Sequence, residues 1–225
     1  MKISVIIPVL NEEKTIAATL RAVAALRPCE IIVVDGGSRD RTLENCQGPG
    51  IQVLGCGSGR ARQMNYGARC ATGEVLLFLH ADTKLPHSAL EDIAAALSEA
   101  RCPGGRFDVD LEGSHWMLKL VAALINGRSR LTKIATGDQA IFVRRAVFAQ
   151  VGGYPGIPLM EDIALCRALK RLGRIACLRS RVVTSARRWE RDGVWRTIFR
   201  MWTLKLLYLS GVSPARLKQF YADTR

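Results

Sequence analysis

The stretch Lys2-Ile-Ser-Val-Ile-Ile-Pro-Val-Leu-Asn-Glu12 decides how the rest of the chain is interpreted. Its run of β-branched residues is too short for a helix, so residues 2–9 are expected to form a buried strand. Asn11 can cap a following helix, because apolar residues recur at helical spacing from Ile16 to Leu26. A buried strand followed directly by an amphipathic helix is typical of an α/β fold.

The same alternation continues along the chain. We expect further strands at residues 30–35, 51–54, 74–79, 106–111, 139–143, 175–178 and 182–184. We expect helices at residues 60–71, 88–100, 116–125, 160–172 and 194–209, with a short helix capped by Ser38 or Asp40. This order predicts a Rossmann-type, mostly parallel sheet with flanking helices, followed by C-terminal helices. Ligands bind at the carboxyl edge of such sheets, where Asp35 and Asp82 each follow a strand.

Composition narrows the protein class. A chain of 225 residues with 48% hydrophobic residues can form one α/β domain with a full core. Its net charge of +13 is uneven: residues 1–166 have 18 Lys and Arg against 17 Asp and Glu, and residues 167–225 have 15 against 3. This positive end could face nucleic acid, anionic lipid or a phosphorylated substrate.

Other bulk features indicate the compartment. The seven cysteines are scattered without any C-x-x-C pair, which favours reduced thiols in a cytoplasmic protein. Neither a signal peptide nor an uncharged apolar stretch of 18 residues is found, so no membrane-spanning helix is expected.

Four acidic residues, at three places in the chain, could carry chemistry. Asp35 at a strand end could accept a hydrogen bond from the imide of uracil, and Gly36 would let the backbone approach a planar ligand. Asp82 could ligate a hard cation that bridges two phosphates. Glu161 and Asp162 open a helix and could be a catalytic pair or simple capping charges. Each motif by itself also fits an ordinary turn or helix cap.

The order of the motifs is more informative than any one of them. Pro8-Val-Leu-Asn-Glu12, Val34-Asp-Gly-Gly-Ser-x-Asp40-x-Thr42, Gly59–Gly67, Phe78-Leu-His-Ala-Asp-Thr83 and Glu161-Asp162 together resemble family 2 glycosyltransferases of the GT-A fold. In detail the chain resembles the bacterial subgroup associated with arsenosugar biosynthesis. The resemblance implies a GT-A domain over residues 1–190 and a basic, apolar helical extension over residues 191–225 that packs on it.

The resemblance also implies an activity and a site. The activity would be inverting, metal-dependent transfer of a sugar from a nucleotide diphosphate sugar, with UDP favoured over other nucleotides. The implied nucleotide-binding residues are Pro8, Glu12, Asp35, Gly36, Arg60, Asn65, Gly67, Ala81 and Asp82. Asp82 would also ligate Mg²⁺ or Mn²⁺, Asp162 would be the general base, and Glu161 would shape the acceptor side.

Two motifs depart from the family pattern. His80 stands where the first Asp of the D-x-D motif belongs, so it is either a metal ligand or a hydrogen-bonded residue at a strand end. Arg188 and Trp189 match the end of a Q-x-x-R-W motif, but Ser185 replaces the Gln. Arg188 could contact the diphosphate and Trp189 could stack on a sugar, or both could belong to a basic loop. The pair Gly137-Asp138 is a turn signal that could also border the pocket.

Residues 194–209 allow two interpretations, and each implies a different kind of acceptor. This helix is apolar around much of its circumference, which indicates packing in the core or in a homodimer. The alternative is an interfacial helix that docks on anionic lipid, which would place a cytoplasmic protein at the inner face of the membrane. The acceptor could correspondingly be lipid-linked or a small molecule.

Two other functions fit single features of the sequence. The segment Gly55-Cys-Gly-Ser-Gly59 resembles the dinucleotide loop of an oxidoreductase, but Arg60 stands where the third glycine is required. A non-enzymatic basic protein that binds membrane or nucleic acid would explain the charge. No nucleic-acid module is recognisable, and few aromatic residues lie among the basic ones, so nucleic acid is not expected as a partner.

Overall fold

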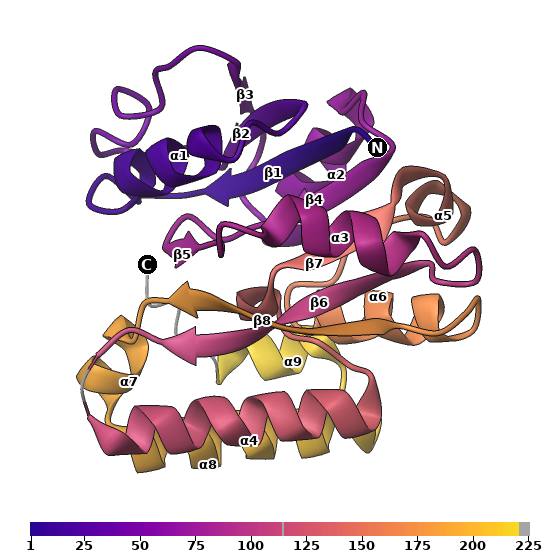
Figure 1. The fold of residues 1–225 in the computed structure, drawn as a ribbon. Helices are drawn as coiled ribbons and strands as arrows, with labels where there is room; N and C mark the ends of the chain where they lie inside the picture. Colours follow the sequence, from indigo (N-terminus) through magenta and orange to yellow (C-terminus); the bar gives the residue numbers. More distant parts are fainter. Residues whose placement is uncertain (114, 221–225) are drawn as a thin grey trace.

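The computed structural model describes residues 1–113 and 115–220, with the side chains of Arg188 and Glu190 excepted. The fold is built on one eight-stranded sheet with the strand order β3-β2-β1-β4-β7-β6-β8-β5. Its strands are β1 (Ile3–Val9), β2 (Glu30–Asp35), β3 (Ile51–Gly55), β4 (Val75–Phe78), β5 (Thr83–Lys84), β6 (Gly104–Leu111), β7 (Ile141–Arg144) and β8 (Ala176–Thr184). Figure 1 shows the sheet running through the whole molecule.

The sheet is parallel in its first half and mixed in its second. Strands β3, β2, β1 and β4 pair in parallel, as the β-α-β order predicts, and β6 pairs with β8 in parallel. The pairings β4–β7, β6–β7 and β5–β8 are antiparallel. The fold class expected from the sequence, an α/β sheet with flanking helices, is confirmed.

Helices cover both faces of the sheet (Figure 1). The helices are α1 (Ile16–Ala25), α2 (Arg60–Cys70), α3 (Ala89–Leu97), α4 (Trp116–Thr132), the 3₁₀ turn η1 (Gly137–Gln139), α5 (Arg145–Gln150), α6 (Glu161–Lys170), α7 (Arg187–Asp192), α8 (Val194–Leu209) and α9 (Pro214–Gln219). Alternation along β1 explains the two layers. Ile7 and its odd-numbered neighbours pack with α1 and α3, whereas Ile6 packs with α2, α5 and α6.

Several local predictions were wrong at their boundaries. The first helix begins at Ile16, because Asn11 adopts a left-handed φ of 55° and its Oδ1 accepts a hydrogen bond from the backbone N–H of Arg39. No helix follows Ser38, because its hydroxyl donates to the Asp35 carboxylate instead of capping one. Ala176–Thr184 forms one strand, where two were expected.

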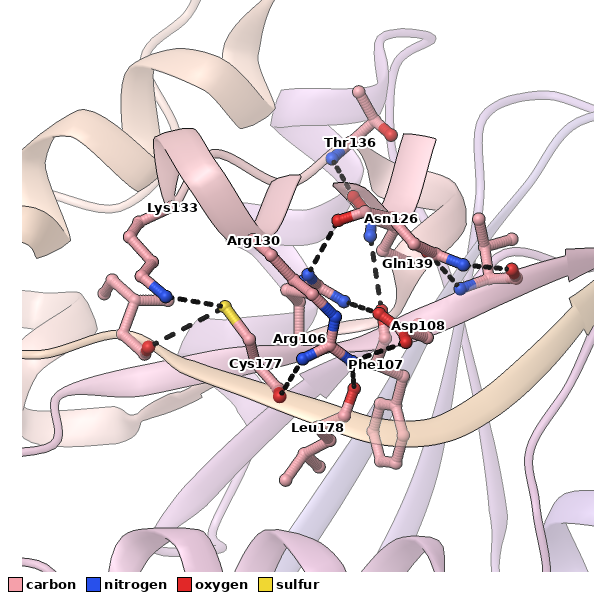
Figure 2. Close-up of polar contacts among 12 residues, drawn as sticks. Arg106, Phe107, Asp108, Asn126, Arg130, Lys133, Thr136, Gln139, Cys177 and Leu178 are labelled. Atoms are coloured by element: carbon pink, nitrogen blue, oxygen red, sulfur yellow. Dashed lines mark hydrogen bonds and ion pairs between the residues drawn. The ribbon is translucent and has the colours of Figure 1, made fainter. Parts of the chain in front are cut away.

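A buried ionic network fixes α4 to the sheet (Figure 2). The side chain of Arg106 on β6 is only 1% exposed and donates to Asp108. Arg130 of α4 donates to the other carboxylate oxygen of Asp108 and to the carbonyls of Cys177 and Leu178 on β8. The network therefore joins α4, β6 and β8.

Candidate functional site

Strand register places three candidate residues at one edge of the sheet: Pro8, Asp35 and His80. Val9 pairs with Asp35 across β1 and β2, and Ile6 pairs with Phe78 across β1 and β4. Pro8 pairs with Val34, the residue before Asp35, and His80 comes two residues after Phe78. Both therefore lie near Asp35 at the carboxyl edge. This is the edge where an open α/β sheet binds its ligands.

Asp35 holds its own loop in place. Its carboxylate accepts hydrogen bonds from the backbone N–H of Gly37 at 2.9 Å and from both the N–H and the hydroxyl of Ser38. The side chain is nearly buried, and Gly36 follows it directly. The resulting tight turn leaves backbone close to the strand end, as contact with a flat ring requires.

Gln63 is a site residue that sequence reasoning missed. From α2, its Nε2 donates to the carbonyl of Val9 at 2.8 Å and to that of Val34 at 2.8 Å. A Cβ added at Gly36 would lie 3.1 Å from the Gln63 side chain, so Gly36 leaves room for it. The available signal was its position four residues before Gly67, on the helical face that is buried against the sheet.

Asn65 and Gly67 have packing roles. The Asn65 amide donates to the Tyr154 carbonyl at 2.8 Å and accepts from the Tyr154 N–H at 2.9 Å. A Cβ at Gly67 would lie 2.6 Å from Ile6 Cγ2, so glycine is needed for α2 to approach the sheet. Contact of these two residues with a nucleotide stays a prediction.

Arg187 connects two candidate carboxylates. Its Nη2 lies 3.0 Å from Glu12 Oε2 and 3.2 Å from Asp82 Oδ2. The neighbouring Ala81 is buried, and its carbonyl accepts a hydrogen bond from the Thr19 hydroxyl at 2.7 Å, which fixes the loop after β4. Glu12 and Asp82, 70 positions apart in the sequence, are thus brought to one cation.

Glu161 and Asp162 begin α6 beside a small cavity. The cavity is lined by Pro8, Arg60, Met64, Phe78, Leu79, His80, Gly137, Ile141, Tyr154, Glu161 and Asp162. The Asp162 carboxylate accepts from the Gly137 N–H at 3.0 Å, and Glu161 lies 4.0 Å from Arg60. Five of the residues predicted from the sequence therefore border one space.

The environment raises the pKa of Asp162 to about 6. Burial is the largest cause, and the negative charges of Glu161 and Asp138 act in the same direction. The N–H of Ile163 and the guanidinium of Arg60 oppose them. A carboxylate with a pKa near 6 is a stronger base than an ordinary aspartate and is still ionised at neutral pH.

His80 packs against Gly137. A Cβ at position 137 would lie 2.5 Å from His80 Nε2, so only glycine fits between the imidazole and η1. The turn η1 is itself held by the buried Gln139, which closes a capping box with Thr136 and donates to the Phe107 carbonyl of β6. Gly137 thus touches both His80 and Asp162.

The Arg-Trp motif lies in helix α7. Trp189 is partly buried against the cluster formed by Leu118, Val121 and neighbouring residues, away from the cavity. The side chain of Arg188 lies outside the described residues. It is Arg187, one position earlier, whose guanidinium reaches the carboxylates of the site.

The sequence matches a known protein family and several known proteins. The model of glycosyl transferase family 2 matches residues 4–151, which span β1 to the start of the loop after α5. An undecaprenyl-phosphate 4-deoxy-4-formamido-L-arabinose transferase of Serratia proteamaculans is 29% identical over 157 residues, covering 64% of this chain and 48% of that protein. A PGL/p-HBAD biosynthesis glycosyltransferase of Mycobacterium bovis is 32% identical over 178 residues, covering 67% and 62%. The chain thus spans about half to three fifths of these relatives.

Solved structures share the fold. TarS of S. aureus superposes with a TM-score of 0.65 at 21% identity, covering 92% of this chain and 66% of that one. The mannosyltransferase PcManGT of Pyrobaculum calidifontis, in complex with GDP-Man and Mn²⁺, gives a TM-score of 0.62 at 21% identity, covering 81% and 56%. The fold is therefore the GT-A arrangement, and the chain belongs to glycosyl transferase family 2.

Proposed function

We propose that this chain is an inverting glycosyltransferase that takes a sugar from a UDP-sugar and transfers it to an acceptor hydroxyl. The observation that carries the proposal is the Asp162 carboxylate, which has a raised pKa and borders the same cavity as Pro8, Arg60 and His80. The proposed base Asp162 and the cationic Arg60 thus border the same cavity as Pro8, at the carboxyl edge of the parallel strands.

The nucleotide would bind at the ends of β1 and β2. Asp35 and Gly36 form the tight turn there, and Pro8 is the last but one residue of the neighbouring strand β1. Uracil offers an imide N–H to a carboxylate, whereas guanine offers an amidine edge. The related structures include TarS with UDP-GlcNAc and PcManGT with GDP-Man, so the fold accommodates either base. We favour UDP because Asp35 ends β2, where its carboxylate could accept the imide N–H of uracil.

The residues present fit a divalent cation. Among the described residues no three His, Cys, Asp or Glu side chains form a ready-made cage. Mg²⁺ and Mn²⁺ bound with a nucleotide need only one or two carboxylates, because phosphates and water complete the shell. Asp82 would be that ligand, at a position where a guanidinium already neutralises it, and His80 is the second candidate. When bound, the cation would neutralise charge developing on the diphosphate leaving group.

Asp162 would perform the proton transfer. Its carboxylate takes the proton from the acceptor hydroxyl as that oxygen attacks the anomeric carbon. The bond from this carbon to the diphosphate breaks on the opposite side, so UDP leaves and the configuration inverts. The N–H of Gly137 fixes the Asp162 carboxylate, and Glu161 beside it helps to keep the base strong.

We also propose a location for the protein and a class of acceptor. The described residues include no helix long and apolar enough to cross a bilayer. Helix α8 nevertheless exposes Trp195, Phe199, Trp202 and Leu206, each more than half exposed. We place the chain in the cytoplasm, with residues 191–225 at the inner face of the membrane and a lipid-linked acceptor. A small-molecule acceptor and a homodimer through α8 are the alternatives.

A screen of ligands by thermal shift tests the donor class. UDP, GDP, ADP and NAD are each added to the full chain with and without Mn²⁺. We expect UDP with Mn²⁺ to give the largest rise in Tm, because a ligand that binds only the folded state stabilises it. Stabilisation by NAD alone would instead favour an oxidoreductase.

A further inference from the structure

Two cationic side chains stand at matching levels of two neighbouring helices. Arg128 is in the last third of α4, and Lys205 is in the last third of α8. Val194 and Ile198, in the first turns of α8, pack against the cluster that contains Leu118 and Val121 in the first turns of α4. The charge of Arg128 also acts on Lys205, so the later turns of the two helices are close as well. Figure 1 shows this pair along the lower edge of the molecule.

The same region of α8 touches the helix that carries the proposed base. Leu204, next to Lys205, is buried against Met160 and Ile163. Ile163 follows Asp162 in the first turn of α6. The side chain of Lys205 is thereby anchored near the start of α6, on the side of Asp162 that faces α4 and α8.

Neither cation has a partner of opposite charge in direct contact. Among the described residues, the ion pairs within 4.0 Å include neither Arg128 nor Lys205. Arg128 Nη2 is buried and makes no hydrogen bond there. Both side chains are only partly exposed. A buried guanidinium nitrogen without an acceptor is costly, which indicates that a ligand supplies one.

Electrostatic interactions connect Arg128 and Lys205 with the carboxylates of Asp138 and Asp162. Burial lowers the pKa of Arg128, while the carboxylates of Asp138 and Asp162 raise it. Burial also lowers the pKa of Lys205, the charge of Arg128 lowers it further, and Asp138 and Asp162 oppose this. Four charged groups from α4, α8, η1 and α6 therefore face one region without forming an ion pair with one another.

We propose that Arg128 and Lys205 form a subsite that binds a phosphate group of the acceptor beside Asp162. A phosphate offers several acceptor oxygens to a guanidinium and an ammonium at once, and charge-assisted bonds of this kind are strong. An acceptor held there would present a hydroxyl near the Asp162 carboxylate. This inference rests on the proposed function, because it names the class of acceptor for the same base.

The phosphate could belong to a lipid or to a small molecule. The outer faces of both helices are apolar: Trp116, Leu120 and Leu124 on α4 and Trp195, Phe199, Trp202 and Leu206 on α8 are at least 45% exposed. An apolar chain attached to the phosphate could lie along these helices. The experiment therefore contains a lipid arm and a soluble arm.

Calorimetric titration of the full chain tests the subsite without donor or turnover. The lipid probe is geranyl phosphate, with geraniol as the uncharged comparison, and the soluble probe is glucose 1-phosphate. We expect Arg128→Met and Lys205→Met each to weaken phosphate binding by about tenfold, as the loss of one charge-assisted bond would. Arg128→Lys and Lys205→Arg should keep most of the affinity. Tighter binding of geranyl phosphate than of glucose 1-phosphate identifies the lipid source, and equal binding identifies the soluble one.

Matched controls separate this inference from general charge and from the donor site. Lys119→Met on α4 and Arg196→Met on α8 remove exposed charges from the same two helices and should leave phosphate binding unchanged. UDP binding with Mn²⁺, measured on the same samples, should be unaffected by Arg128→Met and Lys205→Met. Unaltered phosphate affinity in these two variants, or an equal loss of UDP affinity, would overturn the subsite. Failure of the wild-type chain to bind UDP would count against the proposed function instead.

Discussion

Arg187 Nη2 lies between Glu12 and Asp82, at 3.0 Å from one carboxylate and 3.2 Å from the other. Glu12 is almost fully buried, whereas the Arg187 side chain is about half exposed. The guanidinium can therefore move into solvent more readily than the buried carboxylate of Glu12. In the proposed enzyme, the Arg187 guanidinium lies where the metal ion bound with the donor would lie.

Replacing Arg187 should change metal binding in the absence of nucleotide. In Arg187→Ala the two carboxylates lose their counter-ion, so we expect Mn²⁺ alone to bind several-fold more tightly than in the wild-type chain. Electron paramagnetic resonance of free Mn²⁺ measures this directly. Arg191→Ala, on the same helix but paired with Asp192, is the control and should bind Mn²⁺ like the wild type. Unchanged or weaker Mn²⁺ binding in Arg187→Ala would contradict the assignment of Asp82 as a metal ligand that competes with Arg187.

The rate of transfer should depend on the ionisation of Asp162. Because its pKa is raised to about 6, the group is protonated and inactive as a base below that pH. We expect kcat/KM to fall about tenfold per pH unit below 6 and to level off above 7. Initial rates of UDP release between pH 5 and 8 measure this, with UDP affinity over the same range as the control. A flat profile would argue against Asp162 as the base.

The same raised pKa predicts that the base lowers stability. A carboxyl whose pKa is higher in the folded than in the unfolded chain stabilises the fold below its unfolded pKa, near 3.8, and this contribution is lost as pH rises through about 6. Asp162→Asn should therefore be more stable than the wild type at pH 7.5, by on the order of 1–2 kcal/mol. The difference should shrink between pH 6 and 4. Urea unfolding of both chains measures it, and a less stable Asp162→Asn at pH 7.5 would refute the linkage.

The buried network under α4 should dominate the stability of that region. Asp108→Asn leaves the fully buried Arg106 without its anionic partner, so we expect a loss of about 3–5 kcal/mol in the free energy of unfolding. Asp110→Asn, on the same strand, affects an exposed pair with Arg181 at 3.8 Å and should change stability by less than about 1 kcal/mol. Equal effects of the two substitutions in urea unfolding would mean that the Arg106–Asp108 pair contributes little.

The sequence predicted the strand edge better than the loops. Buried apolar runs determine β1, β2 and β4, so the placement of Asp35 and His80 at or just after strand ends followed from local pattern. The loop after β2 could not be derived in this way. Asn11 binds Arg39 and Ser38 binds Asp35, and both contacts compete with the helix caps that these residues would otherwise form.

Helix α4 shows the same limit. The sequence pattern predicts this helix over residues 116–125. The helix continues to Thr132, since Arg130 finds a buried partner in Asp108, far away in the sequence. Likewise, Arg187 contacts Glu12 and Asp82, a pairing between distant parts of the chain that no local pattern specifies.

Binding of UDP to three matched variants tests the central claim most directly. The claim is that Asp35, Asp82 and Asp162 serve one nucleotide-binding site. Calorimetric titration of UDP with and without Mn²⁺ should show metal-dependent binding to the wild type, at least tenfold weaker binding to Asp35→Ala and Asp82→Ala, and unchanged binding to Asp162→Asn, which should release no UDP from UDP-sugar. Unchanged Mn²⁺-dependent UDP binding in both alanine variants, or normal turnover by Asp162→Asn, would contradict the account.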